Sequence, residues 1–193
     1  MIRLGLTGSI GMGKSTTAQM FRDHGVPVVD ADAVVHDLYR GEAVEPIEAA
    51  FPGSVVNGAV DRGRLAERLA KDPAGFKTLE AIVHPLVWQK EKEAIDRLRA
   101  ENTPLVVLDI PLLYENHAEA RVDRVVVVTA DSAVQKARVM ARPGMTEEKF
   151  RMILSRQMPD SEKRRRADFI IDTGLGLEHA RQRVDEILRE LKV

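Results

Sequence analysis

The sequence predicts an α/β fold in which a parallel β-sheet lies between layers of helices. Short runs of Val, Ile and Leu recur along the chain, and most are continuous rather than alternating. Strands that are covered on both faces have this pattern. Segments with helical periodicity separate the runs, and such alternation of strand and helix is typical of a doubly wound sheet.

Five apolar runs are interpreted as strands. They cover 2–6, 26–29, 105–109, 125–128 and 168–172, and only the first alternates, through Ile2, Leu4 and Leu6. Helical spacing is found before Gly25, in the region that follows Pro85, and over 177–191. The His84-Pro85 pair is therefore interpreted as a helix start.

Two long gaps between the strands indicate insertions in a single folded unit. We expect the core to cover about 1–32, 104–130 and 167–193. The first insertion, about 33–103, should be mainly helical, with breaks at Phe51-Pro52-Gly53 and near Asp72-Pro73. The second insertion, about 131–166, should be a helical lid with a break at Arg142-Pro143-Gly144.

Composition excludes several classes of protein. The 193 residues include 29 Lys and Arg against 30 Asp and Glu, so the net charge of -1 favours neither nucleic acid nor anionic membrane as a partner. Aromatic residues make up only 4%, which argues against base stacking on RNA. Cysteine is absent, and the five histidines lack metal-ligand spacing, so no zinc site is expected. We expect a cytoplasmic protein with no membrane span.

The clearest motif lies at the end of the first strand. In GLTGSIGMGKSTT, Gly8, Gly13, Lys14 and Ser15 fit the P-loop pattern G-x-x-x-x-G-K-[ST]. Glycines let the backbone approach an anion, and the amides of the loop and the following helix N-terminus can hold a phosphate. Lys14 would add charge at the β- and γ-phosphates, and Ser15 could ligate Mg²⁺. A glycine turn that binds nothing is the alternative, but the strand and helix that flank the loop favour a P-loop.

Carboxylates follow two of the predicted strands at the edge where such sheets bind ligands. Asp109 ends an apolar strand and could hold Mg²⁺. If the strand pattern persists past Val29, Asp30 and Asp32 point to one face, and one of them could accept a proton from an attacking hydroxyl. The alternative is a helix N-cap, which has more weight for Asp30 than for Asp32.

Arginines of the second insertion are further candidates. Gln135, Arg138 and Arg142 share one helical face, and arginines over a triphosphate neutralise developing charge. The basic run at 163–166 is interpreted instead as a solvated face. On spacing alone, His84 is more often a structural residue than a catalytic one.

In this order, the motifs resemble the dephospho-CoA kinase family over nearly the whole chain. The matching segments are GLTGSIGMGKST (5–16), VVDADAVVH (28–36), DRGRL (61–65), LEAIVHP (79–85), DIPLLYE (109–115), QKARVMARPGMT (135–146) and ADFIIDTG (167–174). Many families share the P-loop, whereas Asp-Ala-Asp, His-Pro and DIPLLYE in this order are far more specific.

The resemblance implies a P-loop kinase-like, three-layer fold with a five-stranded parallel sheet, a helical CoA-binding insertion and a helical lid. It implies transfer of the ATP γ-phosphate to the ribose 3′-hydroxyl of dephospho-CoA, with Mg²⁺ as cofactor. The partners would be ATP and dephospho-CoA, with no nucleic acid or membrane, and the protein would be a monomer.

The resemblance also implies residue roles. Asp32 would be the general base, with Lys14 and Arg138 as further catalytic residues. The metal ligands would be Ser15 and Asp109. The acceptor side would include His84, Leu112, Leu113 and Glu115. The ATP-binding residues would be Gly8, Gly11, Met12, Gly13, Lys14, Ser15, Thr16 and Arg142.

The chain departs from the family pattern at two places. The family usually has Asn where this chain has Thr173, in a loop near the adenine. It often has Phe in the segment that follows DRxxL, where this chain reads Ala66 to Ala70 without an aromatic residue.

Three other functions compete with this one. A P-loop kinase for a nucleoside or nucleotide is the nearest alternative, and Asp-Ala-Asp with His-Pro argues against it. A nucleotide switch that transfers no phosphate is a second, although the N-K-x-D guanine signature of GTPases is absent from the sequence. An RNA-binding protein fits poorly with the charge balance and scarce aromatics.

Overall fold

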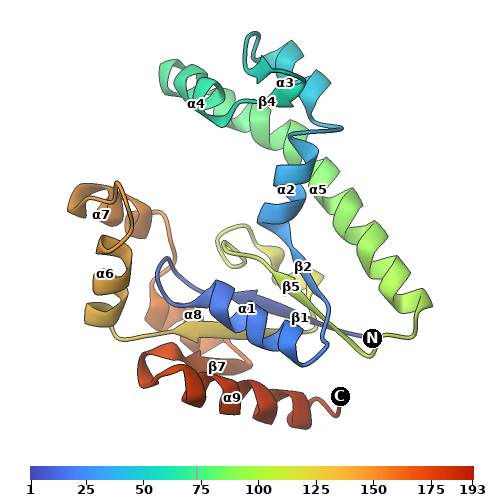
Figure 1. Cartoon of the computed structure of the whole chain (residues 1–193), viewed down its shortest axis with the longest axis vertical. Helices are drawn as coiled ribbons and strands as arrows, with labels where there is room; N and C mark the ends of the chain where they lie inside the picture. The colour runs from blue at the N-terminus through green and yellow to red at the C-terminus, as the bar shows by residue number, and fades with distance from the viewer. Residues whose placement is uncertain (73) are drawn as a thin grey trace. The chain divides into compact units, whose positions relative to one another are not determined.

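The computed structural model describes residues 1–72 and 74–193, which form two compact units (Figure 1). The first unit comprises Met1–Val29 and Arg99–Val193, and the second comprises Asp30–Leu98. The predicted insertion at about 33–103 overlaps most of the second unit. The other predicted insertion, about 131–166, lies within the first unit. Pro73, part of one expected break, lies outside the described residues.

The first unit is built on a five-stranded parallel sheet, as predicted. Its spatial order is β2-β5-β1-β6-β7. In the register of the central strands, Ile2 faces Leu105 and Leu4 faces both Val107 and Arg124. The strands are β1 (Ile2–Thr7), β2 (Val28–Asp30), β5 (Leu105–Asp109), β6 (Arg124–Thr129) and β7 (Phe169–Asp172). All five residues of β5 are buried, which explains its uninterrupted apolar sequence.

Helices α1 (Lys14–Asp23) and α9 (Leu177–Glu190) pack against each other and against the sheet. Their apolar faces meet the sheet in one core, in which Phe21, Val184 and Ile187 are fully buried with Leu4 and Leu6. Burial of these apolar faces explains why apolar residues recur with helical periodicity in both segments.

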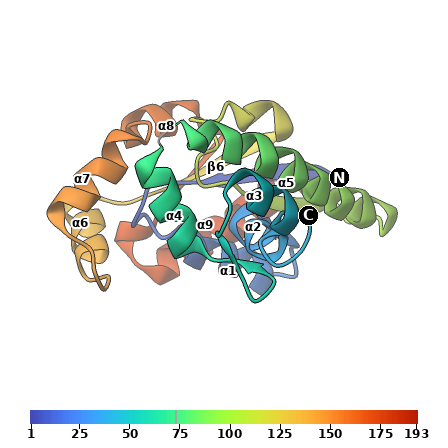
Figure 2. The same cartoon turned by 90° about the horizontal axis from the view of Figure 1, so that it is seen from above.

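Three further helices complete the first unit. They are α6 (Ser132–Met140), α7 (Glu147–Ser155) and α8 (Asp160–Arg166). Short 3₁₀ turns cover Ala118–Arg121 and Thr173–Leu175. Figures 1 and 2 show α6 and α7 side by side, beyond the end of β6. The predicted break at Arg142-Pro143-Gly144 separates these two helices.

The second unit has its own helices and core. The helices are α2 (Ala31–Leu38), α3 (Val44–Ala50), α4 (Arg62–Lys71) and α5 (Gly75–Ala100), the last of which ends in residues of the first unit. Ile47 is fully buried among apolar side chains that include Leu38, Leu65 and Val83. In the described part of the chain, no helix combines the length and apolar character needed to cross a membrane.

A two-stranded hairpin in this unit was not predicted from the sequence. Strands β3 (Val55–Val56) and β4 (Ala59–Val60) pair antiparallel around Asn57 and Gly58. Both turn residues have positive φ, 51° and 76°. Asn-Gly is the usual sequence of such a turn, but strands of only two residues carry no apolar pattern that would mark a hairpin beside it.

The prediction that a helix starts at Pro85 was wrong. Helix α5 begins at Gly75, and Pro85 lies in its interior. A proline removes one backbone hydrogen bond and usually ends a helix. Here the helix continues because residues on both sides of Pro85, such as Val83 and Val87, are buried in the core of the second unit.

Candidate active site

The P-loop connects β1 to α1, as the motif predicted. Gly11 and Gly13 adopt positive φ, 77° and 93°, which other residues rarely do. A Cβ on Gly11 would lie 2.5 Å from Val139 Cγ2, and one on Gly8 would lie 2.7 Å from the Val128 carbonyl oxygen. The glycines are therefore required both by the path of the loop and by what packs against it.

Lys14 is the first residue of α1, and its ammonium forms an ion pair with Asp109. Asp109 ends β5 next to β1, where it faces Leu6 in the register, and it is only 3% exposed. The predicted phosphate-binding lysine and the predicted metal ligand are thus brought together. Ser15 and Thr16 follow in the exposed first turn of α1.

Side chains from 131–166 form hydrogen bonds with the backbone of the P-loop. Gln135 Nε2 donates to the Ile10 carbonyl oxygen at 2.8 Å, and the Ile10 N–H donates to Gln157 Oε1 at 3.1 Å. Gln135 shares its helical face with Arg138, as predicted. Gln157 was missed, because no periodicity or motif in the sequence indicates it.

Thr173 connects Arg138 to the P-loop. The Thr173 hydroxyl lies 2.7 Å from the Met12 carbonyl oxygen, to which it donates. Arg138 donates to the same hydroxyl at 2.8 Å and to the Thr173 carbonyl oxygen at 2.9 Å. Thr173 is buried against Gly13, where an added Cβ would come within 3.0 Å of its hydroxyl oxygen. The structure therefore gives Thr173 a role in supporting the loop.

The two aspartates of the Asp-Ala-Asp motif have different roles. Asp30 is the N-cap of α2, and its carboxylate accepts from the N–H groups of Asp32 and Ala33 at 2.9 and 3.2 Å. The strand pattern does not persist past Asp30, so the expectation that both side chains share a strand face was wrong. Capping by Asp30 starts a helix at Ala31 instead. Asp32 lies exposed in the first turn of that helix.

The interpretation of 163–166 as a solvated face was wrong for its first residue. Lys163 is fully buried, with its Nζ 2.9 Å from Glu115 Oε1. A buried ammonium needs such a partner to offset its lost hydration. Glu115 also accepts from the Met158 N–H at 2.7 Å. The other three residues of the run are exposed.

The remaining predicted residues differ in exposure. Leu113 is fully buried, whereas Leu112 is 36% exposed. Helix α6 ends at Met140 before the Pro-Gly turn, so the expectation that Arg142 shares a helical face with Gln135 and Arg138 was wrong, and Arg142 lies exposed in that turn. Tyr114 follows these two leucines in the sequence, and burial raises the pKa of its hydroxyl to about 12. His84 is exposed on α5, with its ring centroid 6.0 Å from that of Trp88.

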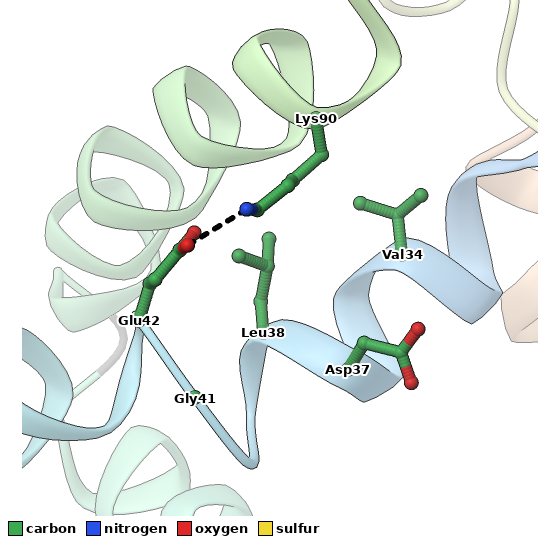
Figure 3. A pocket seen from close by; sticks show the side chains of 6 residues that line it. All are labelled: Val34, Asp37, Leu38, Gly41, Glu42 and Lys90. Carbon is green, nitrogen blue, oxygen red and sulfur yellow. Dashed lines mark ion pairs between the residues drawn. The ribbon is translucent and has the colours of Figure 1, made fainter. Parts of the chain in front are cut away.

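A cavity of about 270 Å³ lies within the second unit, between α2, the turn after it and α5. Figure 3 shows Val34 and Leu38 at its apolar side, and the ion pair of Lys90 with Glu42, 2.7 Å long, across it. The Asp37 carboxylate points away from this ion pair. An apolar side with charges at its rim suits a ligand that is partly apolar and partly polar.

Known proteins resemble this chain over its full length. A relative from Agrobacterium fabrum named dephospho-CoA kinase is 58% identical over 191 residues, which cover 99% of this chain and 98% of that protein. Another so named, from Rhizobium meliloti, is 60% identical over 192 residues, 100% of this chain and 99% of that protein.

Solved structures agree in fold. A protein of Thermus thermophilus matches with a TM-score of 0.86 and 39% identity, over 98% of this chain and 97% of that one. Dephospho-CoA kinase from Campylobacter jejuni matches with a TM-score of 0.75 and 27% identity, over 98% and 96%. The family model for dephospho-CoA kinase matches residues 2–178. The chain belongs to the dephospho-CoA kinase family.

Proposed function

We propose that this protein transfers the γ-phosphate of ATP to the ribose 3′-hydroxyl of dephospho-CoA, which gives CoA and ADP in the final step of coenzyme A biosynthesis. The observation that carries the proposal is a P-loop with Lys14 at a helix N-terminus in a chain that matches this family over residues 2–178.

The P-loop amides and the N-terminus of α1 would bind the ATP phosphates, because both present N–H donors and partial positive charge. Lys14 would neutralise charge on the β- and γ-phosphates. Ser15 and Asp109 would hold Mg²⁺, which neutralises charge on the β- and γ-phosphate oxygens when bound. The hydroxyl and carboxylate fit this ion, because both are hard oxygen donors and phosphates and waters complete its shell.

The transfer would be direct and in line. The acceptor oxygen attacks the γ-phosphorus, the bond from that phosphorus to the β,γ-bridging oxygen breaks, and ADP leaves. Asp32 would orient the 3′-hydroxyl and accept its proton, a role that its exposed carboxylate allows. Arg138 and Arg142 would neutralise charge on the transferring group, and Arg138 would have to leave Thr173 to do so.

The acceptor side would include His84, Leu112, Leu113 and Glu115. The cavity between α2 and α5 is a candidate for the partly apolar pantetheine arm of the acceptor, on the grounds of its apolar side and charged rim. We also propose a cytoplasmic monomer that binds neither nucleic acid nor membrane, in line with the net charge of -1.

The test is ADP release with ATP and Mg²⁺ in the presence of dephospho-CoA, with adenosine and AMP as parallel acceptors. We expect ADP release that depends on dephospho-CoA, with CoA identified as the product. Turnover with adenosine or AMP alone would leave a P-loop kinase with another acceptor and overturn the proposed substrate.

A further inference from the structure

We propose that Gln135 and Gln157 are positioning residues that hold both backbone groups of Ile10 and thereby keep the P-loop in its phosphate-binding conformation. The inference rests on the proposed function in one respect, that the loop binds the phosphates of ATP.

The two side chains form a clamp on one residue of the loop. Gln135 Nε2 donates to the carbonyl oxygen of Ile10, and Gln157 Oε1 accepts from its N–H, at 2.8 and 3.1 Å. Gln135 is 6% exposed, so its hydrogen bond is shielded from competing water. The glutamines lie 22 positions apart in the sequence, on α6 and in the loop that joins α7 to α8.

The next two residues of the loop are held from the same side. Val139 of α6 packs so closely on Gly11 that an added Cβ would lie 2.5 Å from it. At Met12 the carbonyl oxygen accepts from Thr173, which is itself bonded to Arg138 of α6. Three consecutive P-loop residues are thus supported directly or indirectly by α6. This helix supports the loop in addition to carrying Arg138.

Such support is needed because the loop is rich in glycine. Gly8, Gly11 and Gly13 permit its path but also permit many other conformations. Rotation of either peptide group beside Ile10 would change the direction of the amides that follow. Fixing both groups before ATP binds lowers the cost of ordering the loop around the phosphates.

In this account position 135 requires an amide that donates, whereas position 157 requires only an acceptor. A carboxylate at 157 could still accept from the Ile10 N–H, whereas a carboxylate at 135 would set an acceptor against the Ile10 carbonyl. Gln135→Glu and Gln157→Glu therefore add the same charge but differ in whether the hydrogen bond survives. This makes them a matched pair.

The experiment measures ATP binding by calorimetry for Gln135→Met and Gln157→Met, which remove each hydrogen bond without adding charge. We expect the Kd for ATP to rise about three- to tenfold in each, as the loss of one hydrogen bond predicts. In the double variant the effect should be less than the product of the two, because both bonds hold the same residue. The KM for dephospho-CoA should not change.

Gln182→Met is the control for the neutral variants, since Gln182 lies exposed on α9 and donates to Glu186 of the same helix. It should leave ATP binding unchanged. In the charged pair, Gln135→Glu should weaken ATP binding more than Gln157→Glu does, whereas equal losses would assign the effect to charge and overturn the clamp.

A merely structural role would lower the Tm of both methionine variants and leave their Kd for ATP at the wild-type value. That result overturns the proposal. Calorimetry with ATP alone distinguishes failure of the clamp from failure of the proposed function. A wild-type protein that binds ATP but makes no CoA would refute only the substrate assignment.

Discussion

The ion pair of Lys14 with Asp109 joins the lysine of the P-loop motif to the end of β5. Lys14 reaches Asp109 because β1 and β5 are neighbours, so their carboxyl ends meet at one edge of the sheet. In the phosphate-bound enzyme the ammonium would have an additional anionic partner. This residue is therefore the most direct test of nucleotide binding.

We expect Lys14→Met to weaken ATP binding at least tenfold and to lower kcat about a hundredfold or more, as loss of a charge-stabilising group in a transfer reaction does. ATP calorimetry and the ADP-release assay measure the two effects, and far-UV circular dichroism checks that the variant is folded. Wild-type turnover in Lys14→Met would refute the P-loop assignment.

Asp32→Asn should lower kcat about a hundredfold and leave the Kd for ATP unchanged, because the amide cannot accept a proton while the P-loop is intact. Glu45→Gln, an exposed acid on α3 of the same unit, is the matched control and should retain wild-type kcat. If Asp32→Asn weakened ATP binding as much as it lowered kcat, the role as general base would be lost.

At the scale of elements, α2 and α5 enclose the cavity of the second unit. Gly41 lines it, and a Cβ added there would meet only the Asp37 carbonyl oxygen, at 3.6 Å, an ordinary contact. A larger side chain at this position can therefore fill the cavity without straining the backbone.

We expect Gly41→Leu to raise the KM for dephospho-CoA about tenfold and to leave the KM for ATP unchanged, because the side chain would occupy the space assigned to the pantetheine arm. Gly41→Ala, which adds one methyl group, should have a much smaller effect. Equal KM values for Gly41→Leu and wild type would remove the cavity from the acceptor site.

Helices α1 and α9 are linked by His24, and this contact depends on pH. A hydrogen bond to the Met20 carbonyl oxygen, 2.8 Å long, raises the pKa of His24, with burial opposing it and Asp185 adding to it. His24 Nε2 lies 2.6 Å from Asp185 Oδ1. Because the folded state favours the protonated ring, its contribution is complete below the unfolded pKa and is lost as pH rises through the folded pKa.

His24→Gln should therefore reduce the free energy of unfolding by about 0.5 kcal/mol at pH 5.5 and by almost nothing at pH 8.5, since both partners are partly exposed and screened. Urea unfolding of wild type and variant at the two pH values measures this. Asp185→Asn should show the same dependence on pH. A larger loss at pH 8.5 than at pH 5.5 would contradict the assignment.

At the scale of the whole molecule, each unit has a hydrophobic core of its own. The core of the first unit is centred on the sheet, and that of the second contains Ile47, Leu38 and Val83. A cavity made in one core removes contacts only from that unit. Loss of local stability should therefore be confined to it.

Ile47→Ala should destabilise the second unit by about 2–5 kcal/mol, because a fully buried side chain is replaced by a cavity. Amide hydrogen exchange should accelerate in α3 and α4 and remain slow in β1, β5 and β6. ATP binding should persist. Equal acceleration in both units would show that the chain unfolds as one cooperative block.

The sequence by itself determined the five strands of the parallel sheet, the P-loop and the family. The five apolar runs predicted the sheet because buried strands must be apolar throughout, and the glycine pattern predicted the loop because few other sequences follow that path. The positions of Lys14 and Asp109 followed, since carboxyl ends of parallel strands share an edge.

Only the tertiary structure decided which side chains are buried and what they contact. The run at 163–166 looks solvated in sequence, yet Lys163 is buried because Glu115, distant in the chain, neutralises it. Pro85 lies inside a helix because a core on both sides of it maintains that helix. The clamp on Ile10 needs Gln157 as well as Gln135, and no local pattern relates them. Local periodicity records the burial of one segment, whereas these contacts depend on segments that only folding brings together.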